Sequence, residues 1–130
     1  DQLTGDAGDD VLDGGLGNDV LNGGAGADIF AFPAPLLAGN ADTVAGLDAG
    51  LDLIRLQNSV FTAFATAWGV DDSAFETGAA ATTAETRLIF NAENGALLYD
   101  ADGTGSLAAV QFATLTGLVG EVTAEHFLLA

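Results

Sequence analysis

Residues 5–31 read GDAGDDVLD, GGLGNDVLN and GGAGADIFA when they are written in rows of nine. In this register the first position of each row is Gly, the sixth is Asp and the eighth is apolar. The sixth and eighth positions are filled by Asp10, Asp19 and Asp28 and by Leu12, Leu21 and Phe30. A fixed period of this length indicates units that bury their apolar residue only by stacking on neighbouring units. The stretch therefore predicts a stack of three repeats.

Each unit divides into a turn and a short strand. The first six positions are too rich in Gly for a helix or a strand, and Gly accepts the positive φ values of tight turns. The last three, such as Val20-Leu21-Asn22, predict a strand whose middle side chain points inward. Stacked turns bring backbone carbonyls and position-six carboxylates together, and a hard cation relieves their repulsion. Calcium is the expected ion.

Two other interpretations of the Gly-rich stretch are weaker. A phosphate-binding P-loop requires a Lys after the glycines, and the first 54 residues contain none. A disordered linker does not keep an apolar residue at every ninth position.

The three units resemble the RTX nonapeptide repeats of proteins exported by bacterial type I secretion systems. The resemblance implies a right-handed parallel β-roll in which two units form one coil and calcium lies between turns on the same edge. The first and third units would then share an ion held by Gly5, Ala7, Asp9, Asp10, Gly24, Gly26 and Asp28. The middle unit would offer Gly15, Gly17 and Asp19.

The partner of the middle unit lies outside the three rows. Counting back nine residues places Asp1 at position six and Leu3 at position eight of an incomplete earlier unit, so Asp1 is expected to pair with Asp19. This incomplete unit indicates that the sequence begins within a longer array. Asp42 is a second candidate to cap the middle unit, and it is equally consistent with a turn residue that precedes a strand.

The segment after the repeats resembles the one that closes the roll in serralysin-type metalloproteases. The matching residues are Asp42, Val44, Leu47, Gly50 and Asp52. Gly46 and Arg55 depart from the family pattern, in which acidic residues are common at both places.

The composition limits the possible partners. The chain has 130 residues, enough for about one domain, and a formal net charge of -17. This charge excludes sequence-independent binding to nucleic acid or to anionic lipid surfaces and favours cations. Cys is absent, which excludes disulfides and thiol chemistry. No stretch has the length of a transmembrane helix, so membrane insertion is not expected.

The remaining sequence predicts one short helix and a meander. Residues 59–68 place Val60, Phe61, Phe64 and Trp68 on one apolar side of a helix, between Ser59 as N-cap and Gly69 as terminator. Residues 86–116 predict three antiparallel strands, at 87–90, 96–99 and 108–112, with a hairpin at Asn94-Gly95. This second stretch also resembles the segment that follows the repeats in many RTX proteins.

These expectations define an all-β fold. A parallel β-roll of truncated repeats at residues 1–31 would continue into residues 32–130, the roll-closing segment and a C-terminal antiparallel β-sandwich or meander with one short helix. The two parts are expected to form one continuous structural domain.

The loop at Asp100–Gly105 reads DADGTG and has Asp at its first and third positions and Gly at its sixth, as an EF-hand loop does. The twelfth position is Gln111, which lacks the bidentate carboxylate, and strands rather than helices flank the loop. The sequence favours a turn and leaves calcium binding by Asp100 and Asp102 open.

The C-terminal residues Glu125-His126-Phe127-Leu128-Leu129-Ala130 place an acid before an apolar end. This arrangement resembles the uncleaved C-terminal export signal of type I substrates, and it is also consistent with a final edge strand that packs Phe127 and Leu129 on the core. His126 is the only His, so a metal centre built on His is not expected.

No combination of nucleophile and base, carboxylate pair or open metal site is apparent, so the chain is expected to be non-catalytic. The resemblance implies a calcium-dependent folding and type I secretion module at the C-terminus of a larger exported protein of a Gram-negative bacterium. Without calcium the module would be disordered, and it would fold outside the cell. Its partners would be calcium ions, the secretion machinery and an upstream domain of the same chain. The alternative is a calcium-dependent carbohydrate-binding or adhesion module, in which bound calcium bridges to an acidic glycan.

Overall fold

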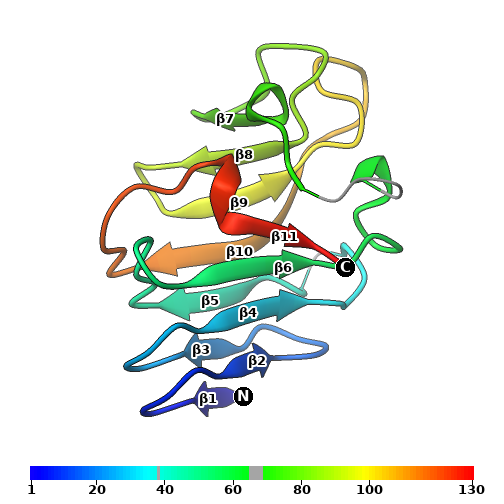
Figure 1. Ribbon diagram of the computed structural model, residues 1–130. Coiled ribbons are helices and arrows are strands. Elements are labelled where there is room, and N and C mark those ends of the chain that lie inside the picture. The colour runs from blue at the N-terminus through cyan, green and yellow to red at the C-terminus, as the bar shows by residue number, and fades with distance from the viewer. Residues whose placement is uncertain (38, 65–68) are drawn as a thin grey trace.

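The computed structural model describes residues 1–37, 39–64 and 69–130. Its strands form two stacked sheets, one of seven strands and one of four, which confirms the predicted all-β class (Figure 1). The seven-stranded sheet has the order β1-β3-β5-β10-β9-β8-β7, and the four-stranded sheet has the order β11-β6-β4-β2. The bounds are β1 Gln2–Thr4, β2 Val11–Asp13, β3 Val20–Asn22, β4 Ile29–Phe32, β5 Asp42–Ala45, β6 Leu53–Leu56, β7 Phe75–Thr77, β8 Leu88–Asn91, β9 Ala96–Tyr99, β10 Val110–Thr116 and β11 Phe127–Leu129.

The first six strands alternate between the two sheets, so each pair of units makes one coil of the chain. Every pairing between these strands is parallel. The register places position eight of one unit opposite position eight of the unit two steps away. Leu3 thus faces Leu21 and Leu21 faces Val44 in one sheet, while Leu12 faces Phe30 and Phe30 faces Ile54 in the other.

This register explains why the nine-residue period produces a core. In β2 and β3 only the middle residue is buried, and the residues on either side are exposed. Successive side chains of a strand point to opposite faces, so one residue per strand enters the space between the sheets. The apolar column is therefore built one side chain per unit.

The antiparallel meander predicted at residues 86–116 is present as β8, β9 and β10. It extends the seven-stranded sheet, because β10 pairs in parallel with β5 on its other side. The third strand lies later than expected, at Val110–Thr116, and a register shift between Gln111 and Ala113 interrupts its pairing with β9. The parallel edge strand β7 was not predicted.

The C-terminal strand β11 pairs in parallel with β6, and Phe127 is buried. The predicted packing of Phe127 and Leu129 against the core is confirmed, because Leu129 is partly buried against the same cluster. The chain thus places its last strand on the last coil of the four-stranded sheet.

The helix predicted at residues 59–68 is not formed in its described part. Thr62–Phe64 makes a 3-10 turn, η1, and residues 65–68, including Trp68, lie outside the described residues. The core role of the apolar side is nevertheless confirmed for Phe61 and Phe64, which are buried. Two further 3-10 turns occur in the described chain, η2 at Asp72–Ala74 and η3 at Ala124–His126.

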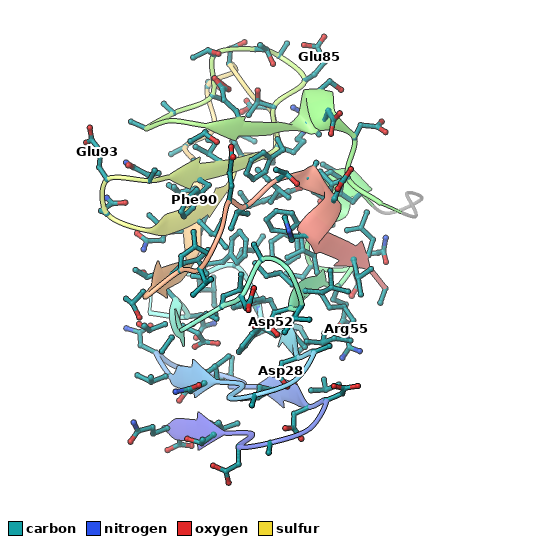
Figure 2. All side chains as sticks on the ribbon, turned by 60° about the vertical axis from the view of Figure 1, so that its left-hand side comes forward. Asp28, Asp52, Arg55, Glu85, Phe90 and Glu93 are labelled. Carbon is teal, nitrogen blue, oxygen red and sulfur yellow. The ribbon has the colours of Figure 1, made fainter. Side chains whose placement is uncertain are left out.

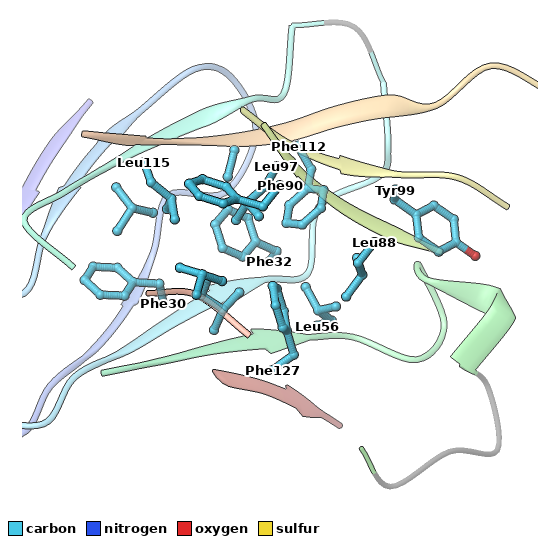
Figure 3. Packing of buried hydrophobic residues seen from close by; sticks show 14 of the residues in the cluster. Phe30, Phe32, Leu56, Leu88, Phe90, Leu97, Tyr99, Phe112, Leu115 and Phe127 are labelled. Carbon is cyan, nitrogen blue, oxygen red and sulfur yellow. The ribbon is translucent and has the colours of Figure 1, made fainter. Parts of the chain in front are cut away.

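Several aromatic side chains pack together in the core next to the meander. Phe112 contacts Phe32 edge-on at a centroid distance of 5.3 Å (Figure 3). Phe61 contacts Phe112 and Tyr99 edge-on, at 5.0 and 5.2 Å. The Tyr99 hydroxyl accepts a hydrogen bond from the Ala63 amide at 2.8 Å, so its polar end is satisfied. This cluster joins the coils to the antiparallel half in one continuous core.

Candidate metal centre

The turns of the first and third units stack directly on each other. The Gly8 amide donates to the Ala25 carbonyl, and the Ala25 amide donates to the Asp6 carbonyl, both at 2.7 Å. The backbones approach so closely that a Cβ on Gly24 would lie 1.9 Å from the Asp6 carbonyl oxygen. A side chain at this position would collide with a carbonyl of the opposite turn, so the glycines of the repeat are required for this contact.

The position-six aspartates form a ladder along each edge of the stack. On one edge the Asp10 amide donates to Asp28 Oδ1, and the Asp28 amide donates to Asp52 Oδ1, both at 2.9 Å. Figure 2 shows Asp28 and Asp52 one above the other on successive coils. On the other edge the Asp19 amide donates to Asp42 Oδ1 at 2.9 Å. Each carboxylate thus uses one oxygen to satisfy the backbone of the turn two units before it.

The second oxygen of the repeat carboxylates has no protein partner. Oδ2 of Asp10, Asp19 and Asp28 is buried and accepts no hydrogen bond within the described chain. A buried carboxylate oxygen without a partner carries a desolvation cost of several kcal/mol unless a cation compensates it. Carboxylate and carbonyl oxygens are the ligands that Ca²⁺ prefers. The donor set therefore fits calcium.

The turns that carry the ligands predicted for the first shared ion are in contact. Ala7 and Ala25 form a parallel bridge, and the Ala27 amide donates to Asp9 Oδ1 at 2.9 Å. A Cβ on Gly5 would lie 2.6 Å from both Asp10 Oδ2 and the Gly23 carbonyl oxygen. A Cβ on Gly26 would lie 2.2 Å from the Gly8 carbonyl oxygen. The turns of the first and third units thus lie against each other, with the carboxylates of Asp9, Asp10 and Asp28 beside them.

The middle unit meets Asp42 rather than the Asp1 side chain. A Cβ on Gly14 would lie 2.8 Å from Asp19 Oδ2 and 2.9 Å from Asp42 Oδ2, so both carboxylates converge on this glycine. The N-terminal ammonium of Asp1 pairs with Asp19, and the Asp1 carbonyl accepts a hydrogen bond from the Val20 amide. The Asp1 side chain is 93% exposed. The edge is therefore lined by Asp19 and Asp42.

Gly15 and Gly17 hold the turn of the middle unit. The Gly17 amide donates to Asn40 Oδ1, and the Gly15 amide donates to Asp13 Oδ1, both at 2.9 Å. Burial is the main cause that raises the pKa of Asp42 above its ordinary value, and the negative charges of Asp19 and Asp13 raise it further. The hydrogen bond from the Asp19 amide acts in the opposite direction. Asp42 thus lies beside two other carboxylates, which disfavour its ionised form.

Sequence reasoning missed the role of Asp52. Its Oδ1 accepts from the Asp28 amide and its Oδ2 from the Asp48 amide, at 2.9 and 2.8 Å. Both oxygens are satisfied by protein donors, so Asp52 closes this edge without an ion. A signal was available, because each ladder residue is followed by two strand residues, the second of them buried in the core: Asp10-Val-Leu, Asp19-Val-Leu, Asp28-Ile-Phe, Asp42-Thr-Val and Asp52-Leu-Ile.

The site is made as much by backbone as by side chains. Within residues 1–37, 39–64 and 69–130, no three His, Cys, Asp or Glu side chains gather around one point to hold a metal. An ion between the turns would therefore need backbone carbonyl oxygens in addition to the repeat carboxylates. Such a mixture is typical of calcium sites, which take six to eight oxygen ligands in flexible geometry.

Comparison with known proteins identifies the repeats. Residues 1–30 match the family described as RTX calcium-binding nonapeptide repeat (4 copies). No curated protein matches the chain. Proteins with RTX repeats are typically secreted, and no helix in the described part of this chain is long and apolar enough to cross a membrane. Residues 1–30 are therefore RTX repeats, and their cofactor is Ca²⁺.

Proposed function

We propose that the chain is a calcium-dependent folding and type I secretion module of a larger exported protein of a Gram-negative bacterium, and that its coiled part is a right-handed β-roll. The observation that carries this proposal is the set of buried carboxylate oxygens without protein partners at Asp10, Asp19 and Asp28. The repeats bind Ca²⁺, and these Oδ2 atoms accept no hydrogen bond in the described chain.

Calcium would act as a folding ligand. Extracellular calcium modules have dissociation constants of about 10⁻⁴–10⁻³ M, so the turns would stay unfilled in a cytosol that is poor in free calcium. An ion that binds only the folded state stabilises it by RT ln(1 + [L]/Kd), which is about 2.7 kcal/mol when its concentration is 100 times Kd. Two or three such ions would decide whether the acid-rich coils close.

The expected export signal is part of the folded sheet. Phe127 is 3% exposed, and the Asn58 amide donates to the Ala130 carbonyl at 2.8 Å. A machine that reads these residues as an extended peptide must therefore meet them before the chain folds. Delayed folding in a cytosol poor in calcium would keep the signal accessible, which links the two roles of the module.

The only His serves the fold rather than catalysis in this proposal. His126 Nδ1 accepts from the Thr123 amide at 2.9 Å, and Nε2 lies 2.7 Å from the Ala49 carbonyl, to which it donates in the matching tautomer. Both ring nitrogens are occupied by backbone groups, so His126 is poorly placed to act as a base. We therefore expect the module to have no activity of its own.

The glycan-binding alternative gains no support from the surface. A hollow of about 460 Å³ is lined by the turn between β8 and β9 and by residues 118–122. Glu93 and Glu121 line it, and both are exposed. These carboxylates would repel an acidic sugar.

The folding role is tested by circular dichroism during calcium titration, with the chelated chain as reference. We expect a cooperative gain of β structure with calcium, and we expect Asp28→Ala to move the midpoint to higher calcium and to remove a bound ion. Asp71→Asn, an exposed acid outside the repeats, is the matched control and should leave the midpoint unchanged. Equal shifts in both variants would contradict a specific role for the ladder.

The secretion role is tested by fusing the chain to a reporter in cells with a type I exporter. Deletion of residues 125–130 should sharply reduce export. Because this deletion also removes core packing, Leu128→Asp provides a second variant that alters the apolar tail at an exposed position, 36% accessible. Normal export of both variants would show that the tail is only a packing strand.

A further inference from the structure

The loop between β9 and β10 contains charged groups that the repeats do not explain. Asp100 directly follows β9 and is only 5% exposed. Asp102 Oδ1 is buried and has no hydrogen-bond partner among the described residues, while its Oδ2 accepts from the Leu107 amide at 3.0 Å. Asp100 Oδ1 accepts only a long bond, 3.2 Å, from the Asp102 amide. Two carboxylates are thus held in a loop with little compensation.

Buried unpartnered side-chain oxygens are found at four aspartates in the described chain. Three of them are the repeat aspartates Asp10, Asp19 and Asp28, and the fourth is Asp102. The repeat oxygens belong to units that bind Ca²⁺, so the same state of the carboxylate marks a cation site in this molecule. We propose that the loop 100–105 holds a calcium ion outside the repeats, with Asp102 Oδ1 and the Asp100 carboxylate as its charged ligands.

Backbone oxygens from a second segment face the same loop. Gly103 has a φ of 65° and lies so close to residues 83–84 that a Cβ would be 2.7 Å from the Thr83 carbonyl oxygen and 2.6 Å from that of Ala84. A Cβ on Gly105 would lie 2.0 Å from Asp102 Oδ2. Gly103 therefore allows the loop to approach the Thr83 and Ala84 carbonyls, and Gly105 allows it to approach the Asp102 carboxylate. This set contains only oxygen, which suits Ca²⁺ better than a transition metal.

The protein does not supply the missing positive charge. The nearby Arg87 guanidinium donates from Nη1 to the carbonyls of Ala84 and Thr86, at 2.7 and 2.9 Å. The ion pair found in the described chain joins the N-terminal ammonium to Asp19, so neither Asp100 nor Asp102 has an ionic partner. A cation from solution would compensate both carboxylates at once.

The affinity of this site should be lower than that of the repeats. An EF-hand loop adds a bidentate carboxylate at its twelfth position, and Gln111 occupies that place here. Two carboxylates and a few carbonyls leave coordination positions to water. We therefore expect a dissociation constant near the weak end of the extracellular range, about 10⁻³ M.

Bound calcium in the full chain can be counted by equilibrium dialysis at about 10 mM calcium, which exceeds this dissociation constant. We expect Asp102→Asn to bind one ion fewer than the unmodified chain. Asn retains an acceptor for the Leu107 amide, so the loop can still close. Asp72→Asn, at an exposed position, makes the same change in charge and should bind the full number.

A second measurement does not depend on a variant. In the unmodified chain, the amide resonances of Gly103 and Gly105 should shift with a millimolar midpoint, after the resonances of the repeats have saturated. An unchanged ion count in Asp102→Asn, or Gly103 and Gly105 resonances that stay fixed up to saturation, would overturn the proposal and leave the loop as a turn. The calcium-induced gain of β structure would be retained in either case, so this result is separate from the test of the repeats.

Discussion

In β2 and β3 one residue of three is buried, whereas β8 and β9 each bury three of their four residues. The coils therefore gain little apolar contact per residue, and their turns carry carboxylates that lack protein partners. The antiparallel half has the denser core, built around Phe61, Tyr99 and Phe112. We therefore expect the seven-stranded sheet to depend on bound calcium at one end and on apolar packing at the other.

Lowering the calcium concentration should separate the two regions most strongly. We expect the Ala25 amide, which bonds the Asp6 carbonyl across the turns, to lose protection from hydrogen exchange at higher calcium than the Leu115 amide of the meander. Loss of two or three ions removes several kcal/mol from the coils, at about 2.7 kcal/mol per ion at 100 times Kd. Exchange measured by NMR in calcium buffers tests this. If both amides lose protection together, the chain is a single cooperative unit.

Phe112→Ala should lower the stability of the antiparallel half without removing a bound ion. Phe112 is 2% exposed and touches Phe32 and Phe61, so its truncation should cost about 3–5 kcal/mol at saturating calcium. The number of bound ions should stay the same. Denaturant unfolding with calcium counting measures both quantities, and Leu107→Ala, at a 59% exposed position, is the control with an expected effect within about 0.5 kcal/mol. A lost ion in Phe112→Ala would contradict the separation.

Asp6→Gly should stabilise the coils. Asp6 is the one described residue other than Gly with positive φ, 75°, and it occupies the second position of its unit, where Gly15 and Gly24 have φ of 77° and 93°. Relief of this conformation should stabilise the folded state by about 1 kcal/mol. Asp6→Asn removes the same charge but keeps a side chain there, so it separates strain from electrostatics. If thermal unfolding shows the same gain in stability for both variants, the cause is relief of repulsion between charges and not relief of backbone strain.

The smallest expected effect concerns Glu76, in the antiparallel half. Hydrogen bonds from the Thr82 hydroxyl and amide, and from Thr86, hold the pKa of Glu76 below its ordinary value. The ionised form is therefore favoured in the folded state. Its contribution is fully present above the unfolded pKa of about 4.3 and is lost as the pH falls through the lowered folded value.

Glu76→Gln tests this contribution. The variant should be less stable at neutral pH by less than about 1 kcal/mol, as expected for an exposed charge, and the difference should vanish in acid. Urea unfolding at several pH values measures it. A difference that persists unchanged at low pH would assign the effect to the Gln side chain rather than to the charge.

Much of the fold could be predicted from local signals in the sequence. The nine-residue phase of Leu12, Leu21 and Phe30 predicts which side chains are buried, and Asn94-Gly95 predicts the hairpin between β8 and β9. The parallel pairing of β10 with β5 and of β11 with β6 could not be predicted in this way. A repeat pattern in nearby residues does not specify which distant strand pairs with the last strand of the coils.

The candidate site was predictable to a similar degree. The repeat ligands follow from the phase, whereas Asn40 lies within residues 33–41, which break it, and Asp52 lies after them. Asn40 Oδ1 accepts from the Gly17 amide in the place of a repeat residue, and its role depends on how residues 33–41 return the chain to the coil.

The pairing of β10 with β5 and of β11 with β6 also bears on the speed of folding. Ala113 lies opposite Asp42 and Phe127 opposite Ile54, so each pairing closes a loop longer than half the chain. Parallel strands of such high contact order form slowly, because the entropy of closure is lost before the contacts are made. The topology itself therefore imposes a kinetic delay. Neither sheet is complete until β10 has paired with β5 and β11 with β6, and this requirement holds at any calcium concentration.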